Sequence, residues 1–254
     1  MAGILAQLRV VQRSIYLLAT IAWGLLAVLL LYPLISVDRQ RSVKRAWSRQ
    51  MVSACGLSLS IKAAKDGRLE PLDGELVVMN HISFIDILAL DALRPVHFIA
   101  KSEIRSWPII GTLCKRTGTI FIERGKRHAV HDVLKVMAAE LRQGEVVSFF
   151  PEGTTGNGIT LLPFHANLFE AAVRSGAKVR PVVIRYAQYG KPSLLPAFID
   201  DLSLVECAIA VFRAEGLAVE LRLLDAISSE GITRHELTLS VRAAMLEAYV
   251  EAEN

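Results

Sequence analysis

No charged residue occurs between Arg13 and Asp38, and this apolar stretch constrains the chain more than any other feature of the sequence. Its core reads IYLLATIAWGLLAVLLLYPLISV, which is long enough to cross the hydrocarbon core of a bilayer, about 30 Å thick, as a helix. It exceeds the apolar region of a typical secretory signal peptide, and no clear A-x-A cleavage site follows it. We therefore expect an uncleaved, membrane-embedded helical segment. Pro33 leaves open whether the segment spans the bilayer or forms a kinked hairpin in one leaflet.

Basic residues are distributed unevenly around this segment. Arg9 and Arg13 precede it, whereas five basic residues follow it closely: Arg39, Arg41, Lys44, Arg45 and Arg49. By the positive-inside rule, this bias predicts a protein of the cell inner membrane whose long C-terminal part is cytoplasmic. We divide the chain into a membrane anchor with an amphipathic connector, residues 1–62, and an α/β domain, residues 63–254. The connector contains the amphipathic residues 45–61, which we expect on the membrane surface or over the domain.

The rest of the chain alternates between strand and helix patterns. Short β-branched or aromatic runs, bounded by turn residues, predict strands at 75–79, 95–100, 118–123, 145–150, 179–186 and 217–224. Helical periodicity predicts helices at 126–143, 166–176 and 233–250, and FIDILALDAL continues as a helix after the first of these strands. The alternation indicates the α/β fold class, with a mostly parallel or mixed central sheet flanked by helices. Such sheets bind ligands at the carboxyl ends of their strands.

Charge and cysteine usage restrict the classes of partner. The formal net charge is +4, and residues 101–127 contain seven basic residues against two acidic ones. This indicates a surface that faces anionic lipid head groups or an anionic substrate, or else an ordinary solvated basic face. No motif favours nucleic acid. Cys55, Cys114 and Cys207 are far apart and form no C-x-x-C pattern, so we expect buried thiols in a reducing compartment and no metal or redox cofactor.

The segment NHISFID, residues 80–86, follows the first predicted strand and carries a histidine and an aspartate. Within one helix, five residues at about 100° each would leave His81 and Asp86 roughly 140° apart. If the helix instead begins at Ser83, Asp86 becomes its third position and leans back toward His81. A carboxylate in that position can orient an imidazole as a general base. S-x-x-D before an apolar run is also a helix-capping pattern, so capping alone is a second interpretation.

Two further loops follow predicted strands. Arg124 and Gly125 end the segment GTIFIERG, and Glu152 lies in the Gly- and Thr-rich turn FFPEGTTGNG. An arginine beside backbone N–H groups that glycine makes accessible is typical of an oxyanion or phosphate site, although a surface arginine and a plain turn would also fit. The sequence contains neither a P-loop spacing nor a G-x-S-x-G motif, which argues against nucleotide hydrolysis and against an α/β-hydrolase nucleophile.

Taken together, these segments resemble the glycerophospholipid acyltransferases of the 1-acylglycerol-3-phosphate (PlsC-like) type. NHISFID is similar to their N-H-x-x-x-x-D signature and GTIFIERG to their second block. FPEGTTGNG is similar to their F-P-E-G-T block, and VRPVVI, with Pro181, to their fourth. One H-x-x-x-x-D is weakly specific, but the four blocks occur in the family order between residues 75 and 185. The N-terminal membrane segment is also similar to that of family members.

The resemblance implies transfer of a fatty acyl group from acyl-CoA or acyl carrier protein to the free hydroxyl of a lysolipid, with lysophosphatidate as the leading acceptor. His81 would be the general base and Asp86 its partner, and backbone N–H groups of the PEGTTG turn would stabilise the developing oxyanion. The resemblance also implies acceptor binding by residues of the blocks: Asn80, Arg124, Glu152, Gly153 and Thr154. Lys101 lies outside the diagnostic blocks and could add positive charge. Membrane lipids would surround the anchor and deliver the lysolipid laterally.

One stretch departs from the commonest family pattern. Many members have a Phe-Lys pair after F-P-E-G-T, whereas this chain has LLPFHANLF, with His165 in place of the lysine. Similar segments belong to a bacterial branch that includes lyso-ornithine lipid acyltransferases, which makes lyso-ornithine lipid the alternative acceptor. Two other classes of protein stay open as alternatives to an acyltransferase: a hydrolase of the same thioester or lysolipid, and a non-catalytic lipid-binding membrane protein. We expect His128 and His131 to be exposed helix residues rather than metal ligands.

Overall fold

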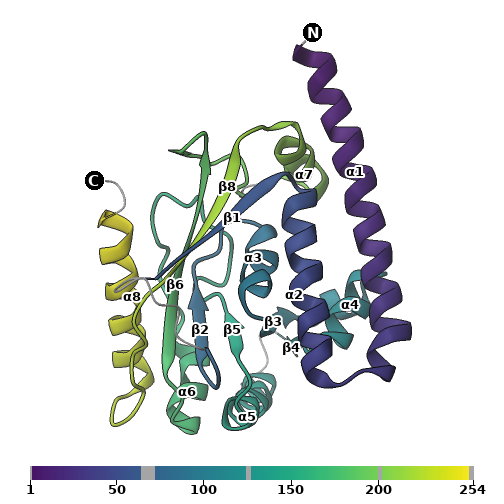
Figure 1. The fold of residues 1–254 in the computed structure, drawn as a ribbon. Helices are drawn as coiled ribbons and strands as arrows, with labels where there is room; N and C mark the ends of the chain where they lie inside the picture. The colour runs from purple at the N-terminus through teal and green to yellow at the C-terminus, as the bar shows by residue number, and fades with distance from the viewer. Residues whose placement is uncertain (1, 64–71, 124–126, 200–201, 252–254) are drawn as a thin grey trace.

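The computed structural model describes residues 2–63, 72–123, 127–199 and 202–251 of the chain. Its centre is an eight-stranded sheet of order β1-β8-β6-β2-β5-β3-β4, with the short β7 paired to β6 (Figure 1). The strands are β1 (Leu57–Ala63), β2 (Leu76–Met79), β3 (His97–Lys101), β4 (Ile120–Ile122), β5 (Val147–Phe149), β6 (Val179–Gln188), β7 (Lys191–Pro192) and β8 (Leu217–Leu223). The five strands from β6 to β4 are parallel, whereas β8 is antiparallel to β6. The expected α/β class with a mixed central sheet is confirmed.

The edge strand β1 is the main difference from the predicted elements. The sequence assigns residues 57–61 to the amphipathic connector, but they form the start of β1, which pairs in parallel with β8. LSLSIKA alternates between more and less buried positions. This period of two begins only three residues after the amphipathic helix α2 (Val37–Ala54), so the two patterns merge in the sequence. The sheet therefore begins before residue 63, and the division into 1–62 and 63–254 stays a prediction.

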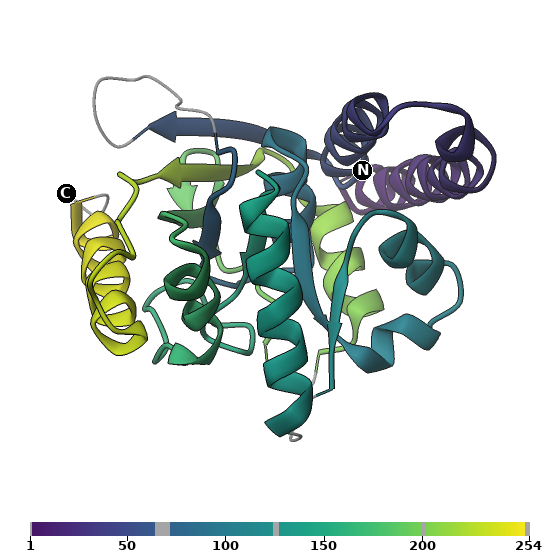
Figure 2. The ribbon, with the colours of Figure 1, turned by 90° about the horizontal axis from the view of Figure 1, so that it is seen from below.

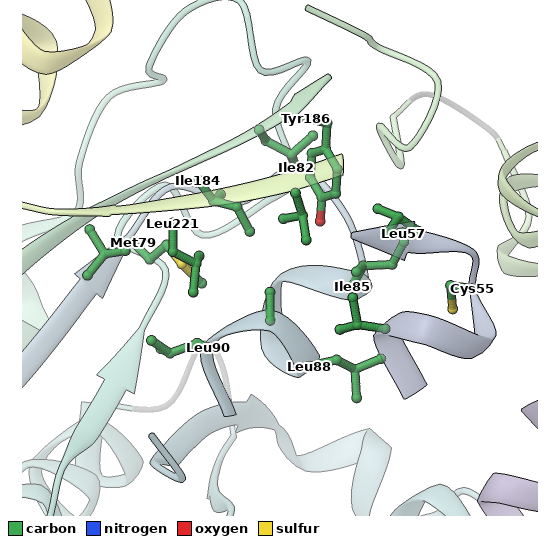
Figure 3. Close-up of a cluster of buried hydrophobic side chains, with 14 of the residues drawn as sticks. Cys55, Leu57, Met79, Ile82, Ile85, Leu88, Leu90, Ile184, Tyr186 and Leu221 are labelled. Atoms are coloured by element: carbon green, nitrogen blue, oxygen red, sulfur yellow. The ribbon is translucent and has the colours of Figure 1, made fainter. Parts of the chain in front are cut away.

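Helices cover both faces of the sheet. On one face lie α2 (Val37–Ala54), α3 (Ile85–Leu93) and α7 (Leu204–Arg213). On the other lie α5 (Arg127–Arg142), α6 (Glu170–Ser175) and α8 (Arg234–Glu251). Because successive residues of a strand point to opposite faces, Val77 and Met79 of β2 join the first core, and Leu76 and Val78 join the second. Figure 3 shows the first core, where Ile184 of β6 and Leu221 of β8 lie over α3.

The N-terminal segment forms a helical hairpin with α2. The helix α1 (Ala2–Leu26) continues through a π-helical turn, Ala27–Leu31, and a 3₁₀ turn, Tyr32–Leu34, before the chain reverses into α2 (Figure 1). Arg13 of α1 donates to the carbonyls of Val211, Phe212 and Ala214 at the end of α7, at 3.3, 3.0 and 2.7 Å. Lys44 of α2 pairs with buried Asp91 of α3 at 2.9 Å. The polar groups of the hairpin thus hold it against the domain.

The outer face of α1 and of the turns that follow it is apolar and exposed. Its exposed members include Ile4, Leu8, Val11, Ile15, Leu18, Leu26, Leu30 and Leu34. The segment Gly3–Leu34 is long and apolar enough to cross a membrane, and only 22% of its most apolar window is buried against the rest of the protein. The expected N-terminal apolar helix is therefore present, and so large an exposed apolar surface indicates membrane association.

Candidate active site

The end of β2 and the start of α3 bring a histidine and an aspartate into contact. β2 ends at Met79, residues 80–84 form a turn, and α3 begins at Ile85. The imidazole Nδ1 of His81 lies 2.8 Å from Oδ2 of Asp86, and the Asp86 side chain is completely buried. The helix starts two residues later than Ser83, but Asp86 still lies in its first turn and leans back over the preceding turn, as the sequence predicts.

The Asp86 carboxylate has three further donors. Oδ2 accepts the backbone N–H groups of Ile82 and Ser83 at 2.6 and 2.9 Å, and Oδ1 accepts the hydroxyl of Tyr186 at 2.5 Å. Burial, together with the charge of Asp86, holds the pKa of Tyr186 well above its usual range, so the phenol stays protonated and donates. These donors fix the carboxylate against rotation, which makes it a rigid acceptor for Nδ1–H of His81.

The His81 ring is fixed on its other sides as well. It stacks on Phe150, which follows β5, with ring centroids 3.8 Å apart and an interplanar angle of 12°. The backbone N–H of His81 donates to Glu152 Oε1 at 2.9 Å, and its carbonyl accepts the N–H of Gly156 at 2.7 Å. The side chain keeps 19% of its surface exposed. Because Nδ1 is bound to Asp86, Nε2 is the nitrogen that remains to accept a proton from a substrate.

Glu152 ties together the two loops that carry the site. Its Oε1 accepts the N–H of His81, and its Oε2 accepts the N–H of Leu162 at 3.0 Å. Burial raises its pKa, an effect that these hydrogen bonds oppose. Gly156 packs so closely that a Cβ there would lie 3.3 Å from Oε2. The sequence predicts Glu152 as an acceptor-binding residue; in the structure both of its oxygens bind backbone amides.

Asn80 has an equally buried position. Its Oδ1 accepts the N–H of Ile184 at 2.8 Å, and its Nδ2 donates to the carbonyl of Ile184 and the hydroxyl of Tyr249 at 3.1 and 2.8 Å. The side chain thereby extends the pairing of β2 with β6 by one position and links the sheet to α8. Only 2% of Asn80 is exposed, and its role at the acceptor stays a prediction.

The remaining predicted residues that the structure describes lie at or near the carboxyl edge of the parallel strands. Lys101 is exposed at the end of β3, where it pairs in register with Ile122 of β4. Gly153 and exposed Thr154 lie in the turn after β5, and Gly153 adopts φ +69°, with the His165 ring 3.1 Å from the position of an added Cβ. Arg124 lies outside the described residues. The described members surround the end of the sheet where His81 lies, the usual ligand-binding edge of such folds.

Two aromatic residues of the site have no counterpart among the predictions. Tyr186 belongs to β6, one hundred positions after Asp86, and Figure 3 shows its hydroxyl pointing toward the start of α3. Phe150 immediately precedes the P-E-G-T turn and supplies the platform under His81. In the sequence, Tyr186 is marked only by its hydroxyl within an apolar strand. Phe150 cannot be told apart from the apolar residues of β5 that precede it. Among the described residues, no group of three or more His, Cys, Asp or Glu side chains is arranged to hold a metal ion.

Comparisons with known proteins agree with this geometry. The Acyltransferase family model matches residues 61–185. The chain is 36% identical over 248 residues to a lyso-ornithine lipid O-acyltransferase of Pseudomonas aeruginosa, covering 95% of this chain and 93% of that protein. It is 36% identical over 181 residues to a 1-acyl-sn-glycerol-3-phosphate acyltransferase of Neisseria gonorrhoeae, covering 69% of this chain and 71% of that protein.

A solved structure shares the whole fold. The crystal structure of the 1-acyl-sn-glycerophosphate (LPA) acyltransferase PlsC from Thermotoga maritima matches with a TM-score of 0.74, covering 100% of this chain and 98% of that one. The two sequences are 18% identical, so this match bears on the fold alone. The chain matches the family model and these relatives, and its N-H-x-x-x-x-D residues form a His–Asp pair. This protein therefore belongs to the acyltransferase family.

Proposed function

We propose that this protein is a membrane-bound O-acyltransferase that moves a fatty acyl group from acyl-CoA or acyl carrier protein to the sn-2 hydroxyl of 1-acylglycerol-3-phosphate, giving phosphatidate. The observation that carries the proposal is the pairing of His81 Nδ1 with buried Asp86, which leaves Nε2 as the ring nitrogen able to accept a proton. The similarity to acyltransferases named for such acceptors supports the substrate class. No acyl-enzyme intermediate is required.

His81 and Asp86 form a catalytic dyad in this proposal, and the reaction follows from their hydrogen bonds. Nε2 of His81 takes the proton of the acceptor hydroxyl while its oxygen attacks the thioester carbonyl carbon. Asp86 stabilises the imidazolium that forms, because its carboxylate already accepts Nδ1–H. The N–H groups of Gly153 and Gly156 already donate to the carbonyls of Phe150 and His81, so those of Thr154 and Thr155 would stabilise the tetrahedral oxyanion. The C–S bond then breaks, and the leaving thiolate takes the proton from the imidazolium, which yields the ester and the free thiol.

We further propose that α1 lies along the cytoplasmic leaflet of the inner membrane instead of crossing it. Its apolar outer face runs from Ile4 to Leu34, whereas Arg9 and Arg13 on its inner face contact Glu215 and the end of α7. A crossing orientation would draw these polar contacts, and the charged helix α2 packed beside α1, into the hydrocarbon. A helix with one apolar and one polar face is suited to the interface.

A second acceptor, lyso-ornithine lipid, is favoured by two observations. The relative from Pseudomonas aeruginosa named for that lipid aligns with nearly the whole chain, further than the relative from Neisseria gonorrhoeae does. His165 replaces the usual lysine and lies against Gly153 in the turn next to the dyad. The dyad chemistry is the same for both acceptors, and only recognition of the head group differs.

The test is an acyl-transfer assay with purified protein in vesicles. Labelled acyl-CoA and acyl carrier protein thioesters are offered with lysophosphatidate or with lyso-ornithine lipid, and His81→Ala is assayed beside the wild type. Label in phosphatidate that is absent with His81→Ala would support the first acceptor. Label only in ornithine lipid would reassign the acceptor, and free fatty acid without diacyl lipid would indicate a hydrolase. Turnover that persists in folded His81→Ala protein would remove the proposed base.

A further inference from the structure

The turn at residues 107–110, between the 3₁₀ turn Ser102–Ser106 and α4 (Ile110–Arg116), exposes three large apolar side chains. Trp107, Ile109 and Ile110 keep 50, 47 and 40% of their surface exposed. Single exposed apolar residues are ordinary, but three large ones within four positions concentrate apolar surface in one turn, and we call these residues the patch; such a concentration indicates an interaction surface. This turn takes no part in the site described above.

The backbone of the turn is strained in a way that keeps the patch outside. Ile109 has φ +62° and ψ −65°, and the N–H of Ile110 donates to the carbonyl of Pro108 at 2.6 Å. This is a γ-turn of the rare φ-positive kind, and a β-branched residue seldom adopts it. Gly111 packs against the backbone carbonyl of Arg105, where a Cβ would lie 2.5 Å away. The fold therefore maintains an outward-facing isoleucine against local backbone preference.

The patch adjoins the apolar surface of the N-terminal hairpin. Leu113 of α4 packs with Val28 and Tyr32 at the closed end of that hairpin. Leu30 and Leu34, at the same end, are themselves exposed. Figures 1 and 2 both show α4 on the same side of the sheet as α1. The apolar surface that α1 presents is thus extended by the turn, on a segment some eighty residues further along the chain.

Basic residues flank the turn along the chain. Arg105, Lys115 and Arg116 are exposed, against a single exposed acid, Glu103, in the segment from Ser102 to the end of α4. An apolar tip with tryptophan, bordered by cations, has the composition of elements that insert between anionic head groups. We propose that residues 107–110 form a wedge that inserts into the lipid bilayer beside α1 and fixes the orientation of the catalytic domain.

The wedge would place the predicted acceptor-binding residues at the depth of the lipid head groups. Trp107 follows Lys101, the last residue of β3, by six positions, so insertion of the turn would hold the carboxyl edge of the sheet at the level of the lipid head groups. An anchor on α1 alone would hold the domain along a single line, whereas a second contact away from that helix restricts the tilt of the domain. This inference rests on the proposed membrane location of α1 and adds a second point of insertion.

The first test measures insertion of the turn into the bilayer and requires no assay of acyl transfer. Purified full-length protein is reconstituted into phosphatidylethanolamine and phosphatidylglycerol vesicles with brominated acyl chains, and Trp107→Phe is prepared in the same way. The difference between the two emission spectra is the fluorescence of Trp107. We expect that difference to be blue-shifted and quenched by the bromines. A difference spectrum that is unquenched by bromines yet quenched by aqueous acrylamide would overturn the wedge, whatever the enzyme's substrate proves to be.

The second test reads its consequence for catalysis. Trp107→Ser with Ile109→Ser should lower the rate on long-chain lysolipid in vesicles about tenfold, because the lost apolar contact is worth on the order of 1–2 kcal/mol. The rate on a monomeric short-chain lysolipid should stay within about twofold, which also shows that the variant is folded. Leu239→Ser on α8, at a 69% exposed position, is the matched control and should change neither rate. Equal rates for the double variant and the control would contradict the wedge, whereas wild-type protein inactive on every lysolipid would contradict the proposed function instead.

Discussion

The same capping pattern occurs before three helices, and the structure gives it two different outcomes. Before α7, the Ser203 hydroxyl accepts the N–H of Glu206 at 3.2 Å, and the Glu206 carboxylate accepts the N–H of Ser203 at 2.9 Å. Thr233 and Glu236 repeat this exchange before α8. Both carboxylates are in solvent, and their hydrogen bonds lower their pKa. These are complete capping boxes with a structural role.

Before α3, only half of the box is formed. Asp86 accepts the N–H of Ser83, but the position before the helix is Phe84, and no side chain caps the helix there. In exchange, the carboxylate is completely buried and gains His81, Ile82 and Tyr186 as partners. The pattern S-x-x-D thus does not separate an exposed cap from a buried partner of a histidine, whereas burial and additional donors do. Asp86 both holds the helix start and orients the imidazole.

Asp86→Asn should have the largest effect on acyl transfer. An asparagine amide would turn an N–H group toward donors that now face a carboxylate, and it would not stabilise the imidazolium. We expect acyl transfer to fall at least about 10³-fold, since a misoriented general base loses most of its contribution. The initial rate in vesicles measures it. Glu206→Gln and Glu236→Gln are the matched controls and should retain wild-type rates, and a comparable loss in either would show that caps alone account for the effect.

Glu152→Gln should come next. Each carboxylate oxygen accepts a backbone N–H, from His81 and from Leu162, and glutamine can accept only one of them. One buried N–H would be left facing an NH₂ group, at a cost of about 1–3 kcal/mol in the free energy of unfolding. Displacement of His81 should lower the rate about 10²-fold, because catalysis depends on position within an ångström. Denaturant unfolding and initial rates together test this, and a loss of stability without a loss of rate would contradict the linking role.

Tyr186→Phe should have a smaller effect with a specific signature. It removes one donor from Asp86 and leaves the packing of β6 intact, so we expect a rate about tenfold lower. With one donor fewer, the carboxylate should hold the imidazolium more tightly, which moves the acid limb of the pH profile of kcat/KM to higher pH. Tyr189→Phe removes an exposed hydroxyl that binds Glu215 and is the control. An unshifted profile for Tyr186→Phe would reduce Tyr186 to a packing residue.

Much of the fold follows from local patterns, and the differences have identifiable causes. The six predicted strands lie in the sheet because each is a short apolar run bounded by turn residues. The sequence does not give the antiparallel pairing of β8 with β6, since strand direction depends on how distant segments meet. It also misses α7, whose ten residues are flanked by Ser203 and Ala214. There the capping box was the available signal.

The candidate site divides in the same way. The contact of His81 with Asp86 follows from five residues of spacing and a helix start between them, so it could be predicted. Tyr186 and the backbone partners of Glu152 could not, because they depend on β6 and on the turn at Leu162 being folded against the dyad. Family blocks mark Asn80 and Glu152 as part of the site without distinguishing substrate contacts from supports. The hydrogen bonds show which groups of the protein each side chain contacts: Ile184 and Tyr249 for Asn80, and the backbone amides of His81 and Leu162 for Glu152.

The smallest effects are expected when Ser203 and Ser83 are each replaced by alanine. Ser203→Ala removes a hydroxyl that caps the N–H of Glu206 and should lower the free energy of unfolding by about 1 kcal/mol at neutral pH. Ser83→Ala should cost less, since Asp86 binds the backbone N–H that alanine retains, and its rate should stay within about threefold of wild type. Denaturant unfolding in detergent micelles measures both. An equal cost for the two would mean that Ser83 acts as a cap after all.

The pH dependence of the Ser203 effect provides a further check. Hydrogen bonds from Ser203 hold the pKa of Glu206 below its ordinary value. A carboxyl with a lowered pKa in the folded state stabilises the protein above its unfolded pKa, and that contribution is lost as the pH falls through the folded pKa. The difference in the free energy of unfolding between wild type and Ser203→Ala should therefore become smaller as the pH falls. The effect of Ser83→Ala, which involves no exposed carboxyl, should not show this pH dependence. A Ser203→Ala difference that widened as the pH fell would show that the exposed box is not held by the ionised carboxylate, and the contrast with Asp86 would have to be explained in another way.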